Sequence, residues 1–314
     1  MQEQIKHRIN KHPPMYTNEH QAMATRFRFQ IQTESEETSQ AILQEAFTIV
    51  DDLELMLSRF IPDSDISRIN RLRKNEQLHI EYETWDIIKN AININKNTLG
   101  AFNINVGEYM NIFKGAKEGI LNAKEVTTAL EKAHKIANEG SMYIDPDQPV
   151  VYCIKEGIKL DLGAIGKGYA LDKVKNFLEE VGVTIYTLEA GDSTILSGEN
   201  TSPNSSWSYQ LTSPSDVKNI ELKNASISAS GTYWQGAHIF NPRTGKNELK
   251  GQFDRVWVCG NNAALSDALS TAFYVMSEDE LKKTVNQIND LNWIAYVKDG
   301  KIEMLSNINK KQNS

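Results

Sequence analysis

The sequence predicts an α+β fold with antiparallel sheets and flanking helices. Helix and strand patterns are interleaved irregularly, without the regular strand–helix alternation of a parallel sheet. The strongest hairpin signal is Asp299-Gly300, which separates alternating segments at 293–298 and 301–305. The 314 residues suffice for one large domain or two intimate ones, and they contain no internal repeat. We expect one domain of two closely packed α/β halves over 21–306.

The first half of the chain is expected to begin with a flexible polar arm over 1–20 and a strand over 25–32. A long amphipathic helix should follow. Its buried stripe is predicted to contain Ile42, Ala46, Ile49, Val50, Leu53, Met56 and Leu57. A polar turn over 58–70 leads into a short helix. Further helices are expected over 85–97 and 122–139, the second ending at Gly140.

In the second half, residues 141–160 are expected to form strands, among them 150–154 and 157–160 around a tight turn. A helix should follow, because apolar residues recur at helical spacing from Ala170 to Val181, and Gly182 offers a stop. Later we expect strands over 183–188 and 255–259 and a strongly apolar helix over 263–276. The stretch 193–222 alternates loosely, and a polar tail is expected over 307–314.

Composition excludes several classes of protein. The net charge of −7 and the lack of a dense basic face argue against nucleic-acid binding. Cys153 and Cys259 each lie in an expected strand, which favours small buried residues over a disulfide or a metal pair. No stretch has the length and apolarity of a membrane span or a signal peptide, so a cytoplasmic location is expected.

A glycine-rich segment, Asp161-Leu-Gly-Ala-Ile-Gly-Lys-Gly-Tyr-Ala-Leu-Asp172, lies where an expected strand turns into a helix. Its glycines allow close approach of the backbone, the first N–H groups of a helix attract anions, and Lys167 adds a positive charge. The segment therefore suggests a cradle for phosphate or pyrophosphate. Its spacing fits neither the P-loop nor the dinucleotide fingerprint, and close packing is the alternative explanation.

The apolar helix carries Asp267 and Thr271 four residues apart, hence on one face, with Ser270 beside them. A carboxylate among apolar residues is costly unless it is paired or binds a cation. Aspartate and threonine oxygens suit Mg²⁺, which uses few protein ligands together with substrate phosphates. The alternative is that Asp267 caps a helix or pairs with a lysine elsewhere.

A second polar cluster is His238-Ile-Phe-Asn-Pro-Arg-Thr-Gly245, which ends in a good turn sequence. His238 could act as a general base, or it could be a hydrogen-bonded structural histidine. Phe60 and Phe102 each lie beside flexible turn residues and could cover a flat ligand, although core packing is the commoner fate of phenylalanine.

The order of these clusters along the chain resembles that of the ApbE family over roughly 22–305. The motifs that carry the resemblance are Met23-Ala-Thr25, Ser58-Arg-Phe-Ile-Pro-Asp-Ser64, Gly100-Ala-Phe102, Asp161 to Asp172, Ala190-Gly-Asp192, Ser230-Gly231, His238 to Gly245 and Asp267-Ala-Leu-Ser-Thr271. The resemblance implies a mixed fold of the ApbE/T-fold-like kind. It also implies an FAD:protein FMN transferase, which moves FMN from FAD to a threonine of an acceptor protein and releases AMP.

The resemblance further implies roles for single residues. The metal, Mg²⁺ with Mn²⁺ or Ca²⁺ as alternatives, would be held by the Ala164 carbonyl, Asp267, Thr271 and Ser270. The nucleotide would be held by Asp161 and Lys167. The FAD pocket would be lined by Met23, Phe60, Ala101, Phe102, Asn103 and Phe240. His238 would deprotonate the acceptor threonine, which in the family lies in a Ser/Thr-Gly-Ala-Thr site.

The chain departs from the family pattern at Asn103 and Asn241, where aspartate is usual, and at Ala24 and Ala190, where glycine is common. Asparagine keeps the shape but loses the charge, which would weaken a contact near the flavin and change the setting of His238. Two alternatives therefore stay open: a metal-dependent FAD pyrophosphatase that yields FMN and AMP, and a non-catalytic FAD-binding protein.

Overall fold

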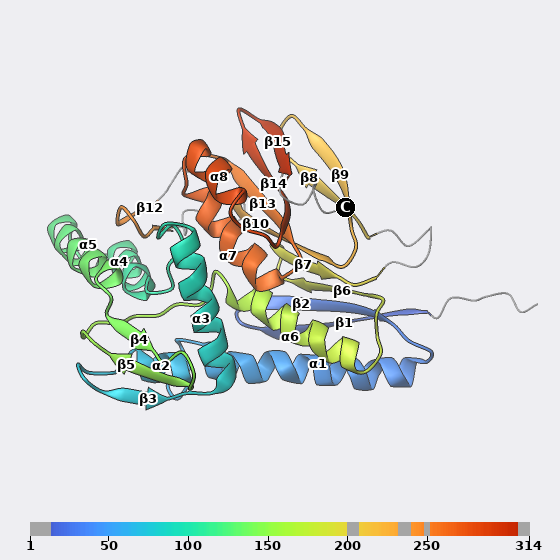
Figure 1. Ribbon diagram of the computed structural model, residues 1–314, viewed down its shortest axis with the longest axis horizontal. Coiled ribbons are helices and arrows are strands. Elements are labelled where there is room, and N and C mark those ends of the chain that lie inside the picture. Colours follow the sequence, from blue (N-terminus) through green and yellow to red (C-terminus); the bar gives the residue numbers. More distant parts are fainter. Residues whose placement is uncertain (1–13, 200–206, 232–239, 248–251, 307–314) are drawn as a thin grey trace, which may run out of the picture.

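The computed structural model describes residues 14–199, 207–231, 240–247 and 252–306 (Figure 1). The expected α+β class is confirmed: an antiparallel sheet of eight strands is covered by helices on one face, and a smaller three-stranded sheet lies to the side. No described helix is long and apolar enough to cross a membrane.

The large sheet has the order β1-β2-β6-β7-β10-β13-β14-β15, and every neighbouring pair is antiparallel. The strands are β1 (Met15–Ala22), β2 (Thr25–Gln32), β6 (Tyr186–Ala190), β7 (Thr194–Ser197), β10 (Ala225–Gly231), β13 (Arg255–Gly260), β14 (Leu291–Lys298) and β15 (Lys301–Ser306). Alternation puts Phe27, Phe29 and Ile31 of β2 fully inside the main core.

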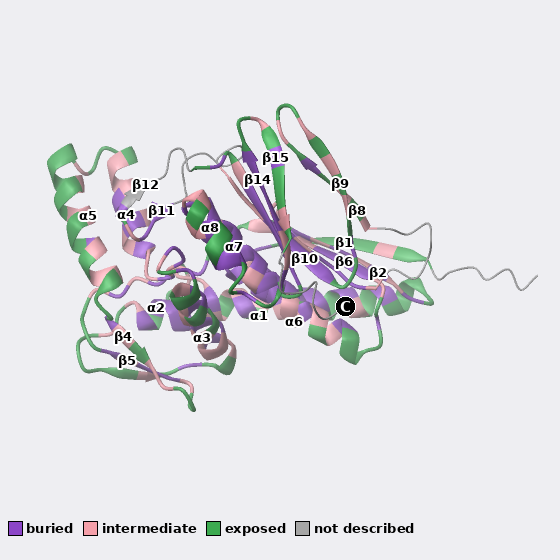
Figure 2. Ribbon diagram, turned by 45° about the horizontal axis from the view of Figure 1, so that its top comes forward, coloured by how far each residue is buried: buried purple, intermediate pink, exposed green. Residues whose placement is uncertain are grey.

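Four helices cover this core: α1 (Glu36–Leu57), α3 (Tyr82–Asn97), α6 (Gly166–Glu180) and α7 (Ala263–Tyr274). Figure 2 shows α7 buried along nearly its whole length. The buried stripe of α1 includes the predicted Ala46, Val50, Leu53 and Leu57. Ile42, Ile49 and Met56 are only partly buried, because Leu43 and Phe47 shift the centre of the stripe.

The opposite face of the sheet has a second core. The hairpin of β8 (Trp207–Thr212) and β9 (Val217–Leu222) covers it with Leu211 and Leu222, which pack against Trp257 and Cys259 of β13. Cys153 and Cys259 are both free and buried, as expected. The sheet is therefore covered on both faces, by helices on one and by a hairpin on the other.

The smaller half contains the sheet β3-β5-β4 and two helices that pack as a pair. Its strands are β3 (Gln77–His79), β4 (Met142–Ile144) and β5 (Val150–Cys153). The short helix α2 (Asp65–Ile69) directly precedes β3 in the chain. The pair is α4 (Gly107–Lys117) and α5 (Ala123–Asn138), which form a third core with Phe240. The remaining elements are β11 (Phe240–Asn241), β12 (Lys246–Asn247) and α8 (Glu278–Val285).

The prediction of a strand over 157–160 is wrong. The backbone there is satisfied by side chains instead of by a neighbouring strand: Lys159 N–H donates to Asn105 Oδ1 at 2.8 Å and Leu160 N–H to Asn70 Oδ1 at 2.6 Å. The expected arm also ends too late, since β1 begins at Met15 and pairs with β2 along its whole length. Residues 1–13 and 307–314 lie outside the described residues.

Two helices escaped the sequence prediction. The start of α4 follows Val106, which offers no side-chain cap, and the helix contains Gly115. The start of α8 has a complete capping box between Ser277 and Glu280, and this signal was present in the sequence. The strand predicted over 183–188 begins later, at Tyr186.

Candidate functional site

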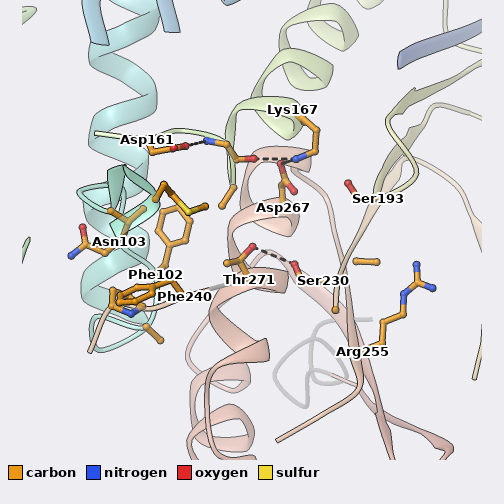
Figure 3. A pocket seen from close by; sticks show the side chains of 18 of the residues that line it. Phe102, Asn103, Asp161, Lys167, Ser193, Ser230, Phe240, Arg255, Asp267 and Thr271 are labelled. Carbon is orange, nitrogen blue, oxygen red and sulfur yellow. Dashed lines mark hydrogen bonds and ion pairs between the residues drawn. The ribbon is translucent and has the colours of Figure 1, made fainter. Parts of the chain in front are cut away.

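A cavity of ≈ 410 Å³ opens between α7 with the strand ends beside it and the segment that leads into α4 (Figure 3). Its wall includes the glycine-rich turn, α7, the turn before β7, the end of β10, the first residue of β13 and the start of α4. Nine of the residues nominated from the sequence line it: Ala101, Phe102, Asn103, Asp161, Ala164, Lys167, Phe240, Asp267 and Thr271.

Among the other four nominated residues, Met23, Phe60 and Ser270 do not line the cavity. The fourth, His238, lies outside the described residues. Met23 packs against the main core, and the Phe60 side chain is 79% exposed. Ser270 is fully buried behind the wall, where its hydroxyl donates to the Asp267 backbone carbonyl at 2.8 Å. The structure therefore brings most, but not all, of the expected set together.

Asp267 is the centre of a buried polar network on α7. Its side chain is 5% exposed, and it accepts hydrogen bonds from Gly168 N–H (3.2 Å), Ser228 Oγ (3.1 Å) and Thr194 Oγ1 (3.3 Å). Lys167 Nζ lies 3.5 Å from Asp267 Oδ2. The lysine partner considered in the sequence analysis is thus present, and it comes from the glycine-rich segment that also faces the cavity.

Thr271 lies one turn further along α7, on the same face as Asp267. Its Oγ1 is 3.2 Å from Ser230 Oγ, which in turn lies 2.8 Å from Ser270 Oγ. The hydroxyls of β10 and α7 therefore form one continuous chain beside the carboxylate, and Thr271 places a second hard oxygen in the cavity wall.

The glycine-rich segment both packs closely against α7 and faces the cavity. Gly168 is required by packing, because a Cβ there would lie 2.2 Å from the Ala263 carbonyl oxygen, where α6 crosses α7. Gly163 N–H donates to Asp161 Oδ1 at 2.9 Å, which fixes the turn before α6. Lys167 Nζ donates to the Gly163 carbonyl at 3.1 Å, so the ammonium group is held over the cavity.

Arg59 is a neighbour of the site that the sequence analysis missed. Its Nε lies 2.6 Å from Asp161 Oδ2, its Nη1 donates to Asn111 Oδ1 at 3.1 Å, and its guanidinium lies 4.4 Å from the centre of the Phe60 ring. The Asp161 carboxylate therefore has a cationic partner at the edge of the cavity. The only hint in the sequence was the place of Arg59 beside Phe60.

The other end of the cavity is apolar. Phe102, Phe240, Val106 and Met110 line it, and Phe240 stacks on Tyr109 with ring centroids 3.9 Å apart. Tyr109 comes from α4, so the helix that the sequence analysis missed supports this wall. Val106, Met110 and Arg255 also contact the cavity without having been nominated.

The two asparagines that depart from the family pattern both use their amide groups as donors. Asn103 Nδ2 donates to the Ala137 carbonyl at 3.2 Å, and Asn241 Nδ2 donates to the Val275 carbonyl at 3.4 Å. A carboxylate could not make either bond while ionised. Asparagine at these positions therefore has a structural explanation, whatever its effect on chemistry.

The start of α7 is capped by another buried carboxylate. Asp172 accepts hydrogen bonds from Ala263 N–H and Ala264 N–H, both at 2.8 Å. Burial raises the pKa of Asp172 to about 6, although these two bonds act in the opposite direction. Asp172 thus links α6 to the first turn of the helix that carries Asp267 and Thr271.

The oxygens of this wall suit a hard divalent cation. Asp267, Thr271 and Ala164 line the cavity, and the first two bring a carboxylate and a hydroxyl to its wall. Among the described residues, no three His, Cys, Asp or Glu side chains gather into a metal cluster. A cation held here would therefore have few charged protein ligands and would need further oxygens from a bound substrate, as Mg²⁺ commonly does.

The family model described as "ApbE family" matches residues 23–295. A relative from Buchnera aphidicola (subspecies Schizaphis graminum), named FAD:protein FMN transferase, is 30% identical over 218 residues, which is 62% of this chain and 62% of the relative. The chain thus spans less than two thirds of that relative. A Vibrio cholerae protein of the same name is 26% identical over 282 residues, covering 83% of this chain and 80% of the relative.

Solved structures share the fold. The flavin transferase ApbE from Vibrio cholerae aligns with a TM-score of 0.82 at 21% identity and covers 95% of this chain and 99% of its own. The apo form of the Pseudomonas stutzeri flavinyl transferase ApbE aligns with a TM-score of 0.80 at 20% identity, covering 96% and 97%.

Proposed function

The chain belongs to the ApbE family, and we propose that it transfers the FMN part of FAD to a threonine hydroxyl of an acceptor protein and releases AMP. Relatives named FAD:protein FMN transferase support this proposal. The observation that carries it is the two-ended cavity, in which Asp267, Thr271 and Lys167 lie at a polar end and Phe102 and Phe240 at an apolar end.

This division matches the chemistry of FAD. An aromatic ring system gains from burial against Phe102 and Phe240, whereas a pyrophosphate needs cations and hydrogen-bond donors. Lys167 offers an ammonium group at the start of α6, where the positive end of the helix dipole favours anions. We therefore place the pyrophosphate against the glycine-rich turn, with one ring system toward the α4 side.

We propose that the metal is Mg²⁺, held by Asp267, Thr271 and the Ala164 carbonyl. Bound there, it would neutralise charge on the phosphates. Ser270 supports this set from behind, because its hydroxyl bonds to the Asp267 backbone and contacts Ser230. Mn²⁺ and Ca²⁺ are also hard cations with oxygen ligands, so the preference has to be measured.

The chain's own residues would act on the two oxygens that change partners. The threonine oxygen forms a bond to the FMN phosphorus, and the bond from that phosphorus to the AMP phosphate oxygen breaks. Lys167 would hold the pyrophosphate in line and offset its charge. His238, two residues before Phe240 in the sequence, would take the proton of the threonine hydroxyl.

In-gel flavin fluorescence tests the proposal. The protein, FAD and Mg²⁺ are mixed with an acceptor domain that carries Ser-Gly-Ala-Thr, and the mixture is separated under denaturing conditions. A fluorescent acceptor band should appear, and it should be lost with EDTA, with His238→Ala and with an acceptor whose threonine is replaced by alanine. His238→Ala should still bind FAD.

The same reaction separates the alternatives. Release of FMN and AMP without a fluorescent acceptor would show a pyrophosphatase that uses water in place of the threonine. Tight retention of unchanged FAD, with several Ser/Thr-Gly-Ala-Thr acceptors tried, would show a binding protein. Either result would overturn the transferase proposal.

A further inference from the structure

Arg255, the first residue of β13, lies in the cavity wall without an anionic partner. Within the part of the chain that the structure describes, no carboxylate pairs with its guanidinium and no hydrogen-bond partner acts on it, since burial is the single influence on its pKa. Its one close contact is the Trp257 ring, whose centre is 4.9 Å from the guanidinium carbon. The positive charge therefore has no counter-charge among the described residues.

The other arginines at this site are paired. Arg59 meets Asp161 at 2.6 Å, and Arg243 meets Glu280 at 2.7 Å. Burial lowers the pKa of Arg255, and no neighbouring carboxylate acts against that effect. Since a desolvated cation without a partner is costly, a position of this kind in a cavity wall suits an anionic ligand.

The direction of the side chain follows from strand alternation. Val256 and Val258 belong to the main core under α7, whereas Trp257 and Cys259 belong to the second core on the opposite face. Arg255 shares the face of Trp257. In Figure 3 it lies on the far side of Ser230 from Thr271. The guanidinium is thus separated from the Asp267 side of the cavity by the end of the sheet.

The backbone beside it is tightly packed. Gly231, the last residue of β10, is paired with Arg255, and a Cβ on that glycine would lie 2.8 Å from the Asp254 carbonyl oxygen and 3.3 Å from the Arg255 Cα and Cγ, so a side chain there would displace the start of β13. Ser193 and Asp192 complete this part of the wall, and Asp192 is exposed. Arg255, Ser230 and Thr271 line the same cavity, so one bound segment of a partner can contact both the guanidinium and the Thr271 side.

We propose that Arg255 binds a carboxylate side chain of the acceptor protein, close to the threonine that receives FMN. This inference rests on the proposed function. The pyrophosphate of FAD has Lys167 and the α6 start on the other side of the sheet end, so it does not need Arg255. The acceptor sequence Ser/Thr-Gly-Ala-Thr itself carries no charge, and its flanking residues must supply the anion.

Direct binding to two labelled peptides tests the proposal. Both peptides contain Ser-Gly-Ala-Ala, in which alanine replaces the acceptor threonine so that no transfer occurs; one is flanked by glutamates and the other by glutamines. Fluorescence anisotropy with the full chain, FAD and Mg²⁺ should show the glutamate peptide binding roughly tenfold more tightly, as expected for one charge-assisted hydrogen bond. The difference should shrink at high salt.

Variants distinguish a direct contact with Arg255 from the effect of the protein's overall electrostatic potential. Arg255→Gln should remove the preference for the glutamate peptide and leave the Kd for FAD unchanged, and Arg255→Lys should keep part of the preference. Arg28→Gln is the matched control: Arg28 lies on β2 of the same sheet and is paired with Glu19 and Glu189, so the preference should survive.

Three results would overturn the inference: equal binding of both peptides by the parent chain, a preference that survives Arg255→Gln, or a Kd for FAD that rises with Arg255→Gln while the peptide preference stays. The last would show that Arg255 binds the FAD phosphates. Threonine versions of the same peptides report transfer separately. A retained peptide preference without FMN transfer would count against the proposed function alone.

Discussion

The two ends of the cavity are stabilised by different interactions: buried hydrogen bonds at one end and apolar packing at the other. The polar end rests on α7, whose residues are almost all buried and whose Asp267 has hydrogen-bond partners on α6, β7 and β10. The apolar end rests on α4 and α5, a pair with a small core of its own and with Ala133 as the only buried residue of α5. Figure 2 shows the contrast, with α7 buried and α5 largely exposed.

The contrast between the two ends indicates where the positions of side chains are strictly fixed. A buried carboxylate with several donors has one low-energy arrangement, because each lost bond leaves an unsatisfied group. An apolar wall tolerates small shifts, since its packing is less directional. Single substitutions at the polar end should therefore lower activity or stability more than comparable substitutions at the apolar end.

The largest effect is expected for Asp267→Asn. The substitution removes the charge opposite Lys167 and the carboxylate proposed to hold the metal. FMN transfer should fall by about 10²–10³-fold, the loss seen when one charge-stabilising group leaves an active site. Steady-state transfer measures it. Asp192→Asn, an exposed position in the same cavity wall, is the control and should change the rate less than threefold, roughly the effect of an exposed charge.

Next in size is Gly168→Ala, which tests the contact between α6 and α7. The new methyl group would lie 2.2 Å from the Ala263 carbonyl oxygen, so the helices would have to separate. We expect a loss of about 3 kcal/mol in the free energy of unfolding, the upper range for overpacking. Urea denaturation measures it.

Gly166→Ala provides the matched control, since nothing lies within 4 Å of its added Cβ at the start of the same helix. Its stability should stay unchanged or rise by up to about 1 kcal/mol, because alanine favours helix. Equal losses for both variants would show that the helix crossing does not depend on a missing side chain.

The sequence predicted the polar end better than the apolar end, for reasons that particular residues make clear. Asp267 and Thr271 share a helix face because they are four residues apart, and this spacing can be read directly from the sequence. Gly168 and Lys167 lie in one continuous segment. By contrast, Tyr109 and Phe240 are far apart in the chain and meet only because α4 packs across β11. No local sequence pattern predicts that contact, and α4 itself is hard to predict because its start has no side-chain cap.

Long-range ion pairs were unpredictable for the same reason. Arg59 with Asp161 and Arg243 with Glu280 join segments that only the tertiary fold brings together. The false strand over 157–160 has the converse cause. Its alternation is real, with Ile158 and Leu160 buried. Its backbone partners, however, are the side chains of Asn70 and Asn105, which no strand pattern reveals.

A smaller effect concerns pH and the Asp172 cap of α7. Its pKa of about 6 in the folded chain lies above the ordinary aspartate value of 3.8. Between these values the folded state binds more protons than the unfolded state, so stability falls as pH rises from about 4 to about 6. The contribution should be up to about 3 kcal/mol, given that one pKa unit corresponds to about 1.36 kcal/mol.

Asp172→Asn tests this sign. It cannot ionise, and it keeps one oxygen that can accept from either Ala263 N–H or Ala264 N–H, while its amide nitrogen cannot accept from the other. Urea denaturation in EDTA should give a flatter dependence on pH, on top of a loss of stability for the missing bond that is the same at every pH. A parent chain that gains stability relative to the variant between pH 4 and pH 6 would contradict the raised pKa.

The smallest effects are expected for two matched variants, each of which removes one hydroxyl group from one end of the cavity. Ser228→Ala deletes a 3.1 Å bond to the Asp267 carboxylate, and Tyr109→Phe deletes a 3.3 Å contact with His134 Nδ1 while keeping the ring stacked on Phe240. A bond to a charged group is worth about 1.5–3 kcal/mol and a neutral one about 1 kcal/mol or less. We therefore expect kcat/KM for FMN transfer to fall about tenfold for Ser228→Ala and less than about threefold for Tyr109→Phe.

The pair decides whether the contrast between the two ends is real. Both variants remove a single oxygen from a largely buried side chain, so cavity size cannot explain a difference between them. Equal losses of kcat/KM would mean that the α4–α5 pair positions the flavin as strictly as α7 positions the phosphates, and the site would then be rigid at both ends. A larger loss for Ser228→Ala, seen in kcat more than in KM, would place the demand for precision at the carboxylate, where charge develops during transfer.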